Sequence, residues 1–294
     1  MKLRIGTRRS RLALAQAGEV AERLARMGVE SEVIPMATSG DRGAPDTSSP
    51  TGVKGLFVAE IVRALQEGEV DLAVHSAKDL PAADDEGVAV AAVPPRADPS
   101  DLLVTREPTL PEGAIVGTSS LRRRAQLLAL RPELRLVEIR GNVDRRLRKL
   151  EDGEVDGVVL AAAGIARLGA TPPSSEVLPI VPAPGQGCLA VQARVDDGAT
   201  REAAAWLDDP DSRVAFEAER SVMARLGGGC ALPLGALATV AGDTVRLVAV
   251  VATPDGSRIV RAESEADTPE GAAAAASAEL LAGGGGEILA HVRA

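Results

Sequence analysis

The chain has 294 residues, enough for two or three compact domains with cores of their own. Hydrophobic residues make up 45% and charged residues 26%, as in an ordinary globular protein. The net charge of −9 and the aromatic content of 1% argue against nucleic-acid binding, which uses basic surfaces and aromatic platforms. No stretch approaches the roughly 18 apolar residues of a membrane span, and the N-terminus does not resemble a targeting segment. We therefore expect a cytoplasmic protein without a membrane or nucleic-acid partner.

The first half of the chain alternates short apolar runs with amphipathic segments, which is typical of an α/β domain. Ser10 is placed to cap a helix that runs toward Met27. The alternation predicts a largely parallel sheet with crossover helices. The segment 39–52 is rich in Gly, Pro, Ser, Thr and Asp and predicts a long mobile loop of the kind that is usually functional. The other expected elements are strands over Leu3–Gly6, Glu32–Met36 and Asp71–Val74 and a helix that includes Ile61–Leu65.

Two proline-punctuated segments, Pro94–Pro99 and Pro182–Gly187, predict two crossings between a first and a second α/β unit. The strand Leu189–Ala193 could rejoin the first domain, which would give a cleft that opens and closes on a ligand. The predicted domains are 1–94 with 188–205, 100–181, and 210–294. In the second domain we expect strands over Ala114–Gly117, Leu136–Ile139 and Val158–Ala161, and helices over Leu121–Leu130 and Val143–Leu150. In the third we expect helices over Ala215–Leu226 and Ala272–Leu281 and strands such as Arg246–Val251.

Four polar clusters follow predicted strands, where helices should begin. Between them they offer hydroxyl groups, backbone N–H groups at helix starts and several guanidiniums, a combination that suits carboxylates and phosphates. An arginine on an exposed helix is usually a solvated charge, but the ligand edge of an open α/β sheet would gather four such clusters in one cleft. A strongly acidic ligand is therefore expected despite the negative total charge. The clusters are Gly6–Ser10, His75–Asp79, Gly117–Arg124 and Arg140–Arg148.

Asp79 follows a strand end beside Lys78, where a carboxylate can act as a general acid or base, stabilise a cation, or only cap a loop. Neither histidine has partners at metal-ligand spacing, so no metal site is expected. Cys230 follows three glycines that let a bulky group approach, and it is either a reactive thiol or an inert turn cysteine. Cys188 precedes an apolar strand and should point into a core, and a disulfide between the two is not favoured. No dinucleotide, P-loop or serine-hydrolase motif is present in the sequence.

Taken together, seven stretches of the chain resemble the porphobilinogen deaminase family, and they occur in the family's order. The matching stretches are GTRRS at Gly6–Ser10, VKGLFVAE at Val53–Glu60, DLAVHSAKDLP at Asp71–Pro81, IVGTSSLRRRAQ at Ile115–Gln126, IRGNVDRRLRKL at Ile139–Leu150, AGIARLG at Ala163–Gly169 and GGGCALPLG at Gly227–Gly235.

The resemblance implies a transferase that joins four porphobilinogen molecules head to tail into hydroxymethylbilane, with release of ammonia, in tetrapyrrole and haem biosynthesis. The product would grow on a dipyrromethane cofactor held by a thioether to Cys230, with Asp79 as the catalytic carboxylate. The implied fold is α/β with three domains: two doubly crossed units that resemble type II periplasmic-binding-protein lobes, and a smaller α+β C-terminal domain. The resemblance also implies a monomer that passes its product to uroporphyrinogen-III synthase.

Each substrate ring carries two carboxylates, so the resemblance explains the arginine clusters as a site for a polyanion. The implied cofactor-binding residues are Ser76, Lys78, Asp79, Thr118, Ser120, Arg122, Arg123 and Arg146. The implied substrate-binding residues are Arg8, Ser10, Lys54, Phe57, Arg140, Arg167 and Gln186.

The chain departs from the family pattern at four positions. Pro50 stands where family members often carry a lysine, Gly227 where they carry an acidic residue, and Cys188 where alanine is common. Asp144 occupies a variable position. The alternative function is a binding module whose two-lobed cleft only holds a small anionic ligand, because a fold does not fix a function.

Overall fold

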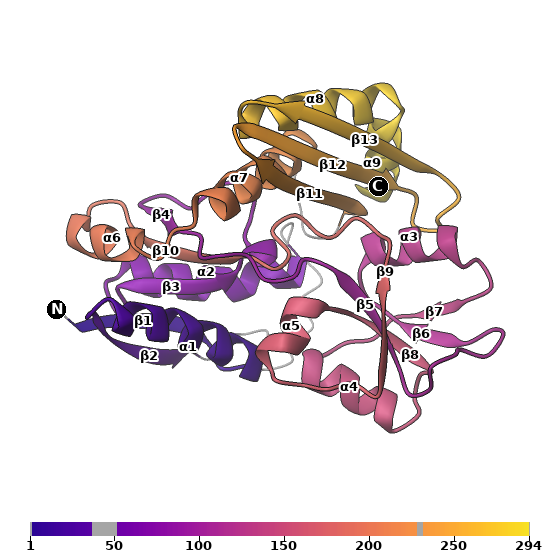
Figure 1. Cartoon of the computed structure of the whole chain (residues 1–294), viewed down its shortest axis with the longest axis horizontal. Coiled ribbons are helices and arrows are strands. Elements are labelled where there is room, and N and C mark those ends of the chain that lie inside the picture. The colour runs from indigo at the N-terminus through magenta and orange to yellow at the C-terminus, as the bar shows by residue number, and fades with distance from the viewer. Residues whose placement is uncertain (1, 37–51, 228–231, 294) are drawn as a thin grey trace.

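The computed structural model describes residues 2–36, 52–227 and 232–293, and their side chains except for those of 52–57. Two α/β lobes lie side by side, and a third domain lies above them (Figure 1). The first lobe contains strands β1 (Lys2–Arg8), β2 (Glu30–Met36), β3 (Leu72–Ser76), β4 (Val88–Ala92) and β10 (Leu189–Arg194), with helices α1 (Arg11–Arg26), α2 (Gly52–Gln66) and α6 (Gly198–Ala205).

The second lobe lies between the two crossings of the chain. It contains strands β5 (Asp101–Thr105), β6 (Ile115–Gly117), β7 (Arg135–Val137), β8 (Gly157–Ala161) and β9 (Ser174–Leu178), with helices α3 (Leu121–Leu130), α4 (Val143–Glu151) and α5 (Ala162–Arg167). The third domain contains helices α7 (Pro210–Arg225), α8 (Pro269–Ala282) and α9 (Gly285–Arg293) and strands β11 (Leu234–Ala241), β12 (Thr244–Ala252) and β13 (Ile259–Ala266). These lobes and the added α+β domain are the fold class expected from the sequence.

Four of the five strands in each lobe's sheet run in the same direction, as the prediction of a largely parallel sheet requires, and one strand of each sheet runs antiparallel to them, which was not predicted. In the first sheet, of order β2-β1-β3-β10-β4, β1 pairs in parallel with β2 and β3, but β10 is antiparallel to β3 and β4. In the second, of order β7-β6-β8-β5-β9, β5 is antiparallel to β8 and β9. The physical reason is that β5 and β10 enter their sheets from the crossings rather than from a crossover helix. β10 lies beside β3, in the first sheet, as expected for the strand Leu189–Ala193.

Helices cover both faces of each sheet and bury an apolar stripe against it. In the first lobe, Val20 and Leu24 of α1 pack with Leu3, Ile5 and Leu72 of the strands, and all five side chains are buried. Burial of one such side chain contributes about 1.5–3 kcal/mol. The opposite face has a separate core, which includes Phe216 of α7. Helix α7 therefore packs into the first lobe while its other apolar residues form the core of the third domain.

The two crossing segments are packed against each other, which requires glycine at one position. Gly187 has a φ of +89°, and a Cβ added there would lie 2.3 Å from the carbonyl oxygen of Ala97. The Ala97 N–H donates to the carbonyl oxygen of Gly187 at 3.3 Å. A side chain at residue 187 would therefore separate the two segments that join the lobes.

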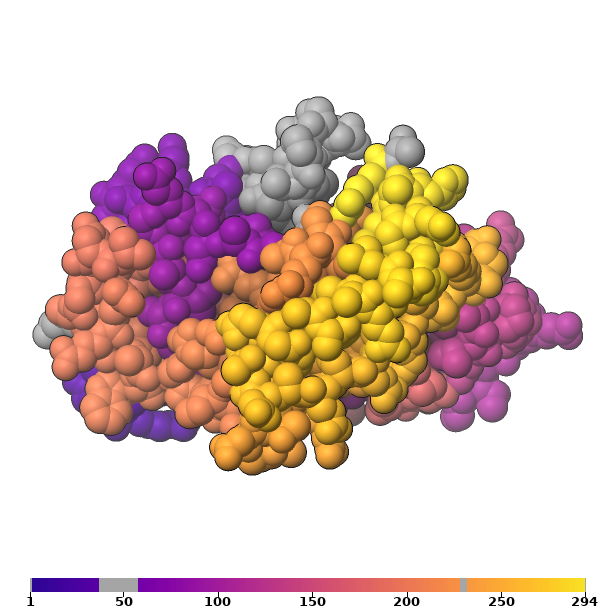
Figure 2. Space-filling view, turned by 90° about the horizontal axis from the view of Figure 1, so that it is seen from above, coloured from indigo at the N-terminus to yellow at the C-terminus, as the bar shows by residue number. Residues whose placement is uncertain are grey.

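Glu219 of α7 is completely buried and joins both crossings to the third domain. Its carboxylate accepts from the guanidinium of Arg96 at 2.6 and 3.2 Å, from the Gly185 N–H at 2.6 Å and from the Ala238 N–H at 2.8 Å. Arg96 and Gly185 belong to the first and second crossing, and Ala238 to β11. Figure 2 shows the third domain, in orange and yellow, lying across the junction between the purple first lobe and the magenta second lobe.

We expect Glu219→Gln to lower the free energy of unfolding by about 3 kcal/mol or more, because it leaves the buried guanidinium of Arg96 without its counter-charge. Glu217→Gln is a matched control on the same helix, since Glu217 is partly exposed and pairs with Arg213 at 3.4 Å. The control should change stability by less than about 0.5 kcal/mol. Urea unfolding of both variants measures the difference, and equal losses would contradict the role given to Glu219.

Candidate active site

The first two polar clusters lie side by side because β1 and β3 are neighbouring parallel strands that end at the same edge of the sheet. The Ser10 hydroxyl caps α1 by accepting from the Ala13 N–H at 3.2 Å, as predicted. One helical turn later, Gln16 donates through Nε2 to the Ser76 hydroxyl at 3.3 Å. This bond joins the start of α1 to the end of β3.

Asp79 ends a short 3₁₀ helix, Ala77–Asp79, that follows β3 directly. His75 on β3 is buried, and its Nε2 has no hydrogen-bond partner among the described residues. Burial lowers the pKa of the His75 imidazole to about 4; the charge of Asp79 opposes this shift and that of Arg8 adds to it. Arg8, His75 and Asp79 therefore share one electrostatic environment, in which the histidine is neutral at pH 7.

The third cluster surrounds the buried carboxylate of Asp101, the first residue of β5. Arg122 Nη1 donates to Asp101 Oδ2 at 2.7 Å, and Arg123 Nε donates to Oδ1 at 2.9 Å. Burial by itself would raise the pKa of Asp101, but the charges of Arg123 and Arg122 hold it well below its usual range. The Ser120 hydroxyl caps α3 by accepting from the Arg123 N–H, and Thr118 is buried beside it. Sequence reasoning missed Asp101, although its place directly after a proline-rich crossing and before an apolar run was a usable signal.

The fourth cluster divides into a partly buried and an exposed part. Arg146 on α4 donates through Nε to the Gly141 carbonyl at 2.9 Å, and no ion pair of Arg146 with another described residue is present. Burial and the neighbouring charge of Arg123 lower the pKa of Arg146. Arg140 lies apart from this group, because it is exposed and pairs with Glu138 at 2.8 Å.

Gln186, at the second crossing, connects the two lobes. Its Oε1 accepts from Lys78 Nζ at 3.2 Å, and its Nε2 donates to Asp101 Oδ1 at 2.9 Å. Arg167 reaches the same crossing, with Nη2 3.2 Å from the Gly187 carbonyl oxygen. The structure thus brings Lys78 of the first lobe and Arg167 of the second to the crossing that contains Gln186, and Asp101 links Gln186 to Arg122 and Arg123.

Three predictions fall outside what the structure describes. Cys230 and residues 39–51 of the predicted loop 39–52 lie outside the described residues, whereas Gly52 begins α2. The side chains of Lys54 and Phe57 on α2 are likewise not described. Cys188 is described: it is buried in the core of the first lobe, as predicted, and burial raises the pKa of its thiol to about 12.

Two departures from the family pattern have a structural explanation. Gly227 follows the last turn of α7 with a φ of +75°, a conformation that favours glycine at the end of a helix. Asp144 on α4 forms an ion pair with Arg11 on α1, with Arg11 Nη1 2.8 Å from Asp144 Oδ1, so it connects the two lobes.

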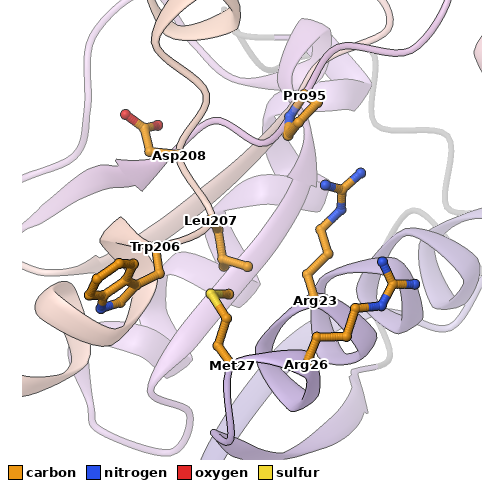
Figure 3. A pocket seen from close by; sticks show the side chains of 7 residues that line it. All are labelled: Arg23, Arg26, Met27, Pro95, Trp206, Leu207 and Asp208. Carbon is orange, nitrogen blue, oxygen red and sulfur yellow. The ribbon is translucent and has the colours of Figure 1, made fainter.

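The described residues contain a hollow of about 260 Å³ at the C-terminal end of α1 (Figure 3). It is lined by side chains that include Arg23, Arg26, Met27 and the exposed Trp206, and by none of the predicted site residues. No described group of three His, Cys, Asp or Glu side chains could hold a metal ion. Within the described ranges, no helix is long and apolar enough to cross a bilayer.

Two crossed α/β lobes that carry hydroxyl groups and guanidiniums around their strand ends belong to a class of fold suited to hold an anionic ligand. The sequence relationships specify it further. Residues 3–202 match the family model of the porphobilinogen deaminase dipyrromethane cofactor-binding domain, and residues 214–282 match the family's C-terminal domain. The chain belongs to the porphobilinogen deaminase family, which confirms the expected synthesis of hydroxymethylbilane on a dipyrromethane cofactor in tetrapyrrole biosynthesis.

Curated relatives match over nearly their whole length. The porphobilinogen deaminase of Brevibacillus brevis is 42% identical over 99% of this chain and 97% of its own, and that of Roseiflexus castenholzii is 47% identical over 98% of each. Among solved structures, a periplasmic substrate-binding protein of an ABC transporter from Coxiella burnetii is 18% identical, with a TM-score of 0.42 over 74% of this chain and 96% of that one. The methionine-binding protein MetQ is 12% identical, with a TM-score of 0.44 over 69% of this chain and 88% of that one.

The buried His75 predicts a dependence of stability on pH. Above pH 6.5 the imidazole is neutral in both the folded and the unfolded state. Between pH 6.5 and about 4 only the unfolded chain binds the proton, so the free energy of unfolding decreases as the pH is lowered through this range. The expected loss is at most roughly 3 kcal/mol, and it stops below pH 4. Urea unfolding at pH 7 and pH 5 should show a smaller loss in His75→Gln than in the wild type. The exposed His291 provides the control, since His291→Gln should retain the full loss.

Proposed function

We propose that the residues at the junction divide the deaminase reaction between the two lobes. Lys78, Thr118, Ser120, Arg122, Arg123 and Arg146, with Ser76, hold the dipyrromethane cofactor. Arg8, Ser10, Arg140, Arg167 and Gln186, with Lys54 and Phe57 on α2, contact porphobilinogen or the growing product. Cys230 provides the thioether attachment and Asp79 the catalytic carboxylate.

The observation that carries this proposal is an uncompensated positive charge around Asp101. Three guanidiniums lie together here, those of Arg122, Arg123 and Arg146. Among the described residues, Asp101 is the one carboxylate that forms ion pairs with any of them. The buried Nε of Arg122 also has no hydrogen-bond partner among the described residues. Buried donors without partners are costly, and the carboxylates of a dipyrromethane would satisfy them. The residues present therefore fit this cofactor.

Bound dipyrromethane supplies the primer on which the product is built. Asp79 then has two tasks that suit a carboxylate beside a neutral histidine: it accepts hydrogen bonds from pyrrole N–H groups, and it stabilises the cation formed when the amine leaves. Because burial keeps His75 neutral at pH 7, the imidazole adds no positive charge that would compete with that cation. Arg8 lies in the same electrostatic environment, and the planar fork of a guanidinium suits a substrate carboxylate.

Gln186 contacts both lobes at once, because it hydrogen-bonds to Lys78, next to Asp79, and to Asp101, which pairs with Arg122 and Arg123. A change in the arrangement of the lobes would therefore alter its hydrogen bonds. The domain boundaries 1–94 with 188–205, 100–181 and 210–294 accord with this division of roles. A cytoplasmic monomer that passes hydroxymethylbilane to uroporphyrinogen-III synthase stays a prediction from the family resemblance.

The anchor is tested by intact-protein mass spectrometry. We expect the purified wild type to carry a mass excess of two linked pyrrole units, absent from Cys230→Ser because only that sulfur forms the thioether. Cys188→Ala is the matched control and should keep the excess, because its thiol is buried and its pKa is raised. An active wild type without added mass would refute the covalent attachment.

The catalytic role is tested by Asp79→Asn, which keeps the size of the side chain and removes its charge. We expect kcat for ammonia release from porphobilinogen to fall by about 10²-fold or more, with the mass excess retained. The exposed Asp85→Asn should leave kcat unchanged. Near-normal turnover in Asp79→Asn would contradict the assignment, and binding of porphobilinogen to the wild type without ammonia release would favour the binding-module alternative.

A further inference from the structure

Arg167 is the last residue of α5, and a carboxylate from the other lobe fixes its direction. Its side chain is only 9% exposed. Arg167 Nε donates to Glu19 Oε2 at 2.9 Å, and Nη2 donates to the Gly187 carbonyl oxygen at 3.2 Å. No hydrogen bond from Nη1 to another described residue is present. Two edges of the guanidinium are therefore held, and the remaining donors can meet a ligand.

Glu19 reaches Arg167 from α1, where α1 and α5 pack against each other. A Cβ added at Gly164 of α5 would lie 3.7 Å from Leu12 Cδ2 of α1, so the two helices are in close contact. Glu19 lies in the middle of α1, which is anchored to the first sheet by its buried stripe. Its carboxylate is therefore a fixed reference point of the first lobe for an arginine of the second.

A carboxylate near a polyanion site could repel the ligand, but the charge of Glu19 is already compensated. Its Oε1 accepts from Arg23 Nη2 at 3.1 Å, on the next turn of the same helix, while Oε2 accepts from Arg167. Two guanidiniums share one carboxylate, so the group keeps one positive charge. Glu19 can thus orient Arg167 without cancelling its attraction for a substrate carboxylate.

We propose that Glu19 is a positioning residue that orients Arg167 for a carboxylate of porphobilinogen or of the growing product. This inference rests on the proposed function of Arg167 in substrate binding. Glu19 belongs to the first lobe and Gly187 to the second crossing, whereas Arg167 belongs to the second lobe. The guanidinium of Arg167 is therefore held in this orientation only when the two lobes are arranged as they are here. Glu19 acts through Arg167 and takes no part in bond making or breaking.

The test compares cofactor-loaded Glu19→Ala and Glu19→Gln with Glu22→Gln, using initial rates of ammonia release against porphobilinogen concentration. Glu22 is the matched control, since it is an exposed glutamate on the same helix that pairs with Arg26 at 3.9 Å. We expect KM to rise roughly tenfold in Glu19→Ala and about threefold in Glu19→Gln, whose amide oxygen can still accept from Nε. In both variants kcat should stay within about twofold, because binding rather than chemistry is weakened. Glu22→Gln should match the wild type.

A second comparison separates positioning from a general effect of charge or stability. In an Arg167→Ala background, Glu19→Ala should cause no further rise in KM, because the residue on which it acts is absent. An unchanged KM in Glu19→Ala, a lowered KM, or a rise that persists without Arg167 would each overturn the inference. Thermal unfolding of every variant identifies any loss of fold, and Glu19→Gln keeps the test valid if Glu19→Ala does not fold. Absence of ammonia release by the wild type would instead mean that the proposed function fails.

Discussion

The arrangement of the three domains depends on one buried carboxylate, that of Glu219. Removing this charge from water is expensive, and burial raises the pKa of the carboxyl. Arg96 and two backbone N–H groups offset that cost, and these donors come from the first crossing, the second crossing and β11. Because no one of these segments could satisfy the carboxylate alone, the ion can be buried only when all of them meet at α7.

The candidate site depends on the same meeting point. Gln186 follows Gly185, whose N–H binds Glu219, and extends in the other direction to Lys78 and to Asp101. Asp101 in turn orients Arg122 and Arg123. A connected set of hydrogen bonds therefore runs from the centre of α7 to Lys78, next to the proposed catalytic Asp79, and to the arginines proposed to hold the cofactor. Helix α7 itself ends five residues before Cys230. The parts of the site are held by one continuous structure, although they come from three domains.

What the sequence could predict is local, and what it missed is long-range. The cap at Ser10 and the positions of the predicted helices follow from spacing over a few residues, and these predictions were right. Strands β4, β5 and β9 and the mixed pairing were missed, because pairing direction depends on how the crossings return. Asp101 and Glu219 pair with residues between 21 and 123 positions away. The place of Asp101 in the sequence could mark it as unusual, but nothing local identifies the distant partner of either carboxylate, so only the fold reveals which arginines are already paired.

These pairings also explain how a chain with a net charge of −9 can attract a polyanion. Acidic side chains near the junction share their charge with more than one arginine: Asp101 with Arg122 and Arg123, and Glu19 with Arg23 and Arg167. In each group the carboxylate fixes the geometry of the guanidiniums, while a positive charge remains for the ligand. Since screening limits interactions to about 8 Å at physiological salt, the ligand responds to these groups far more than to acidic residues elsewhere on the surface. Local pairing, rather than composition, therefore sets the sign of the potential at the site.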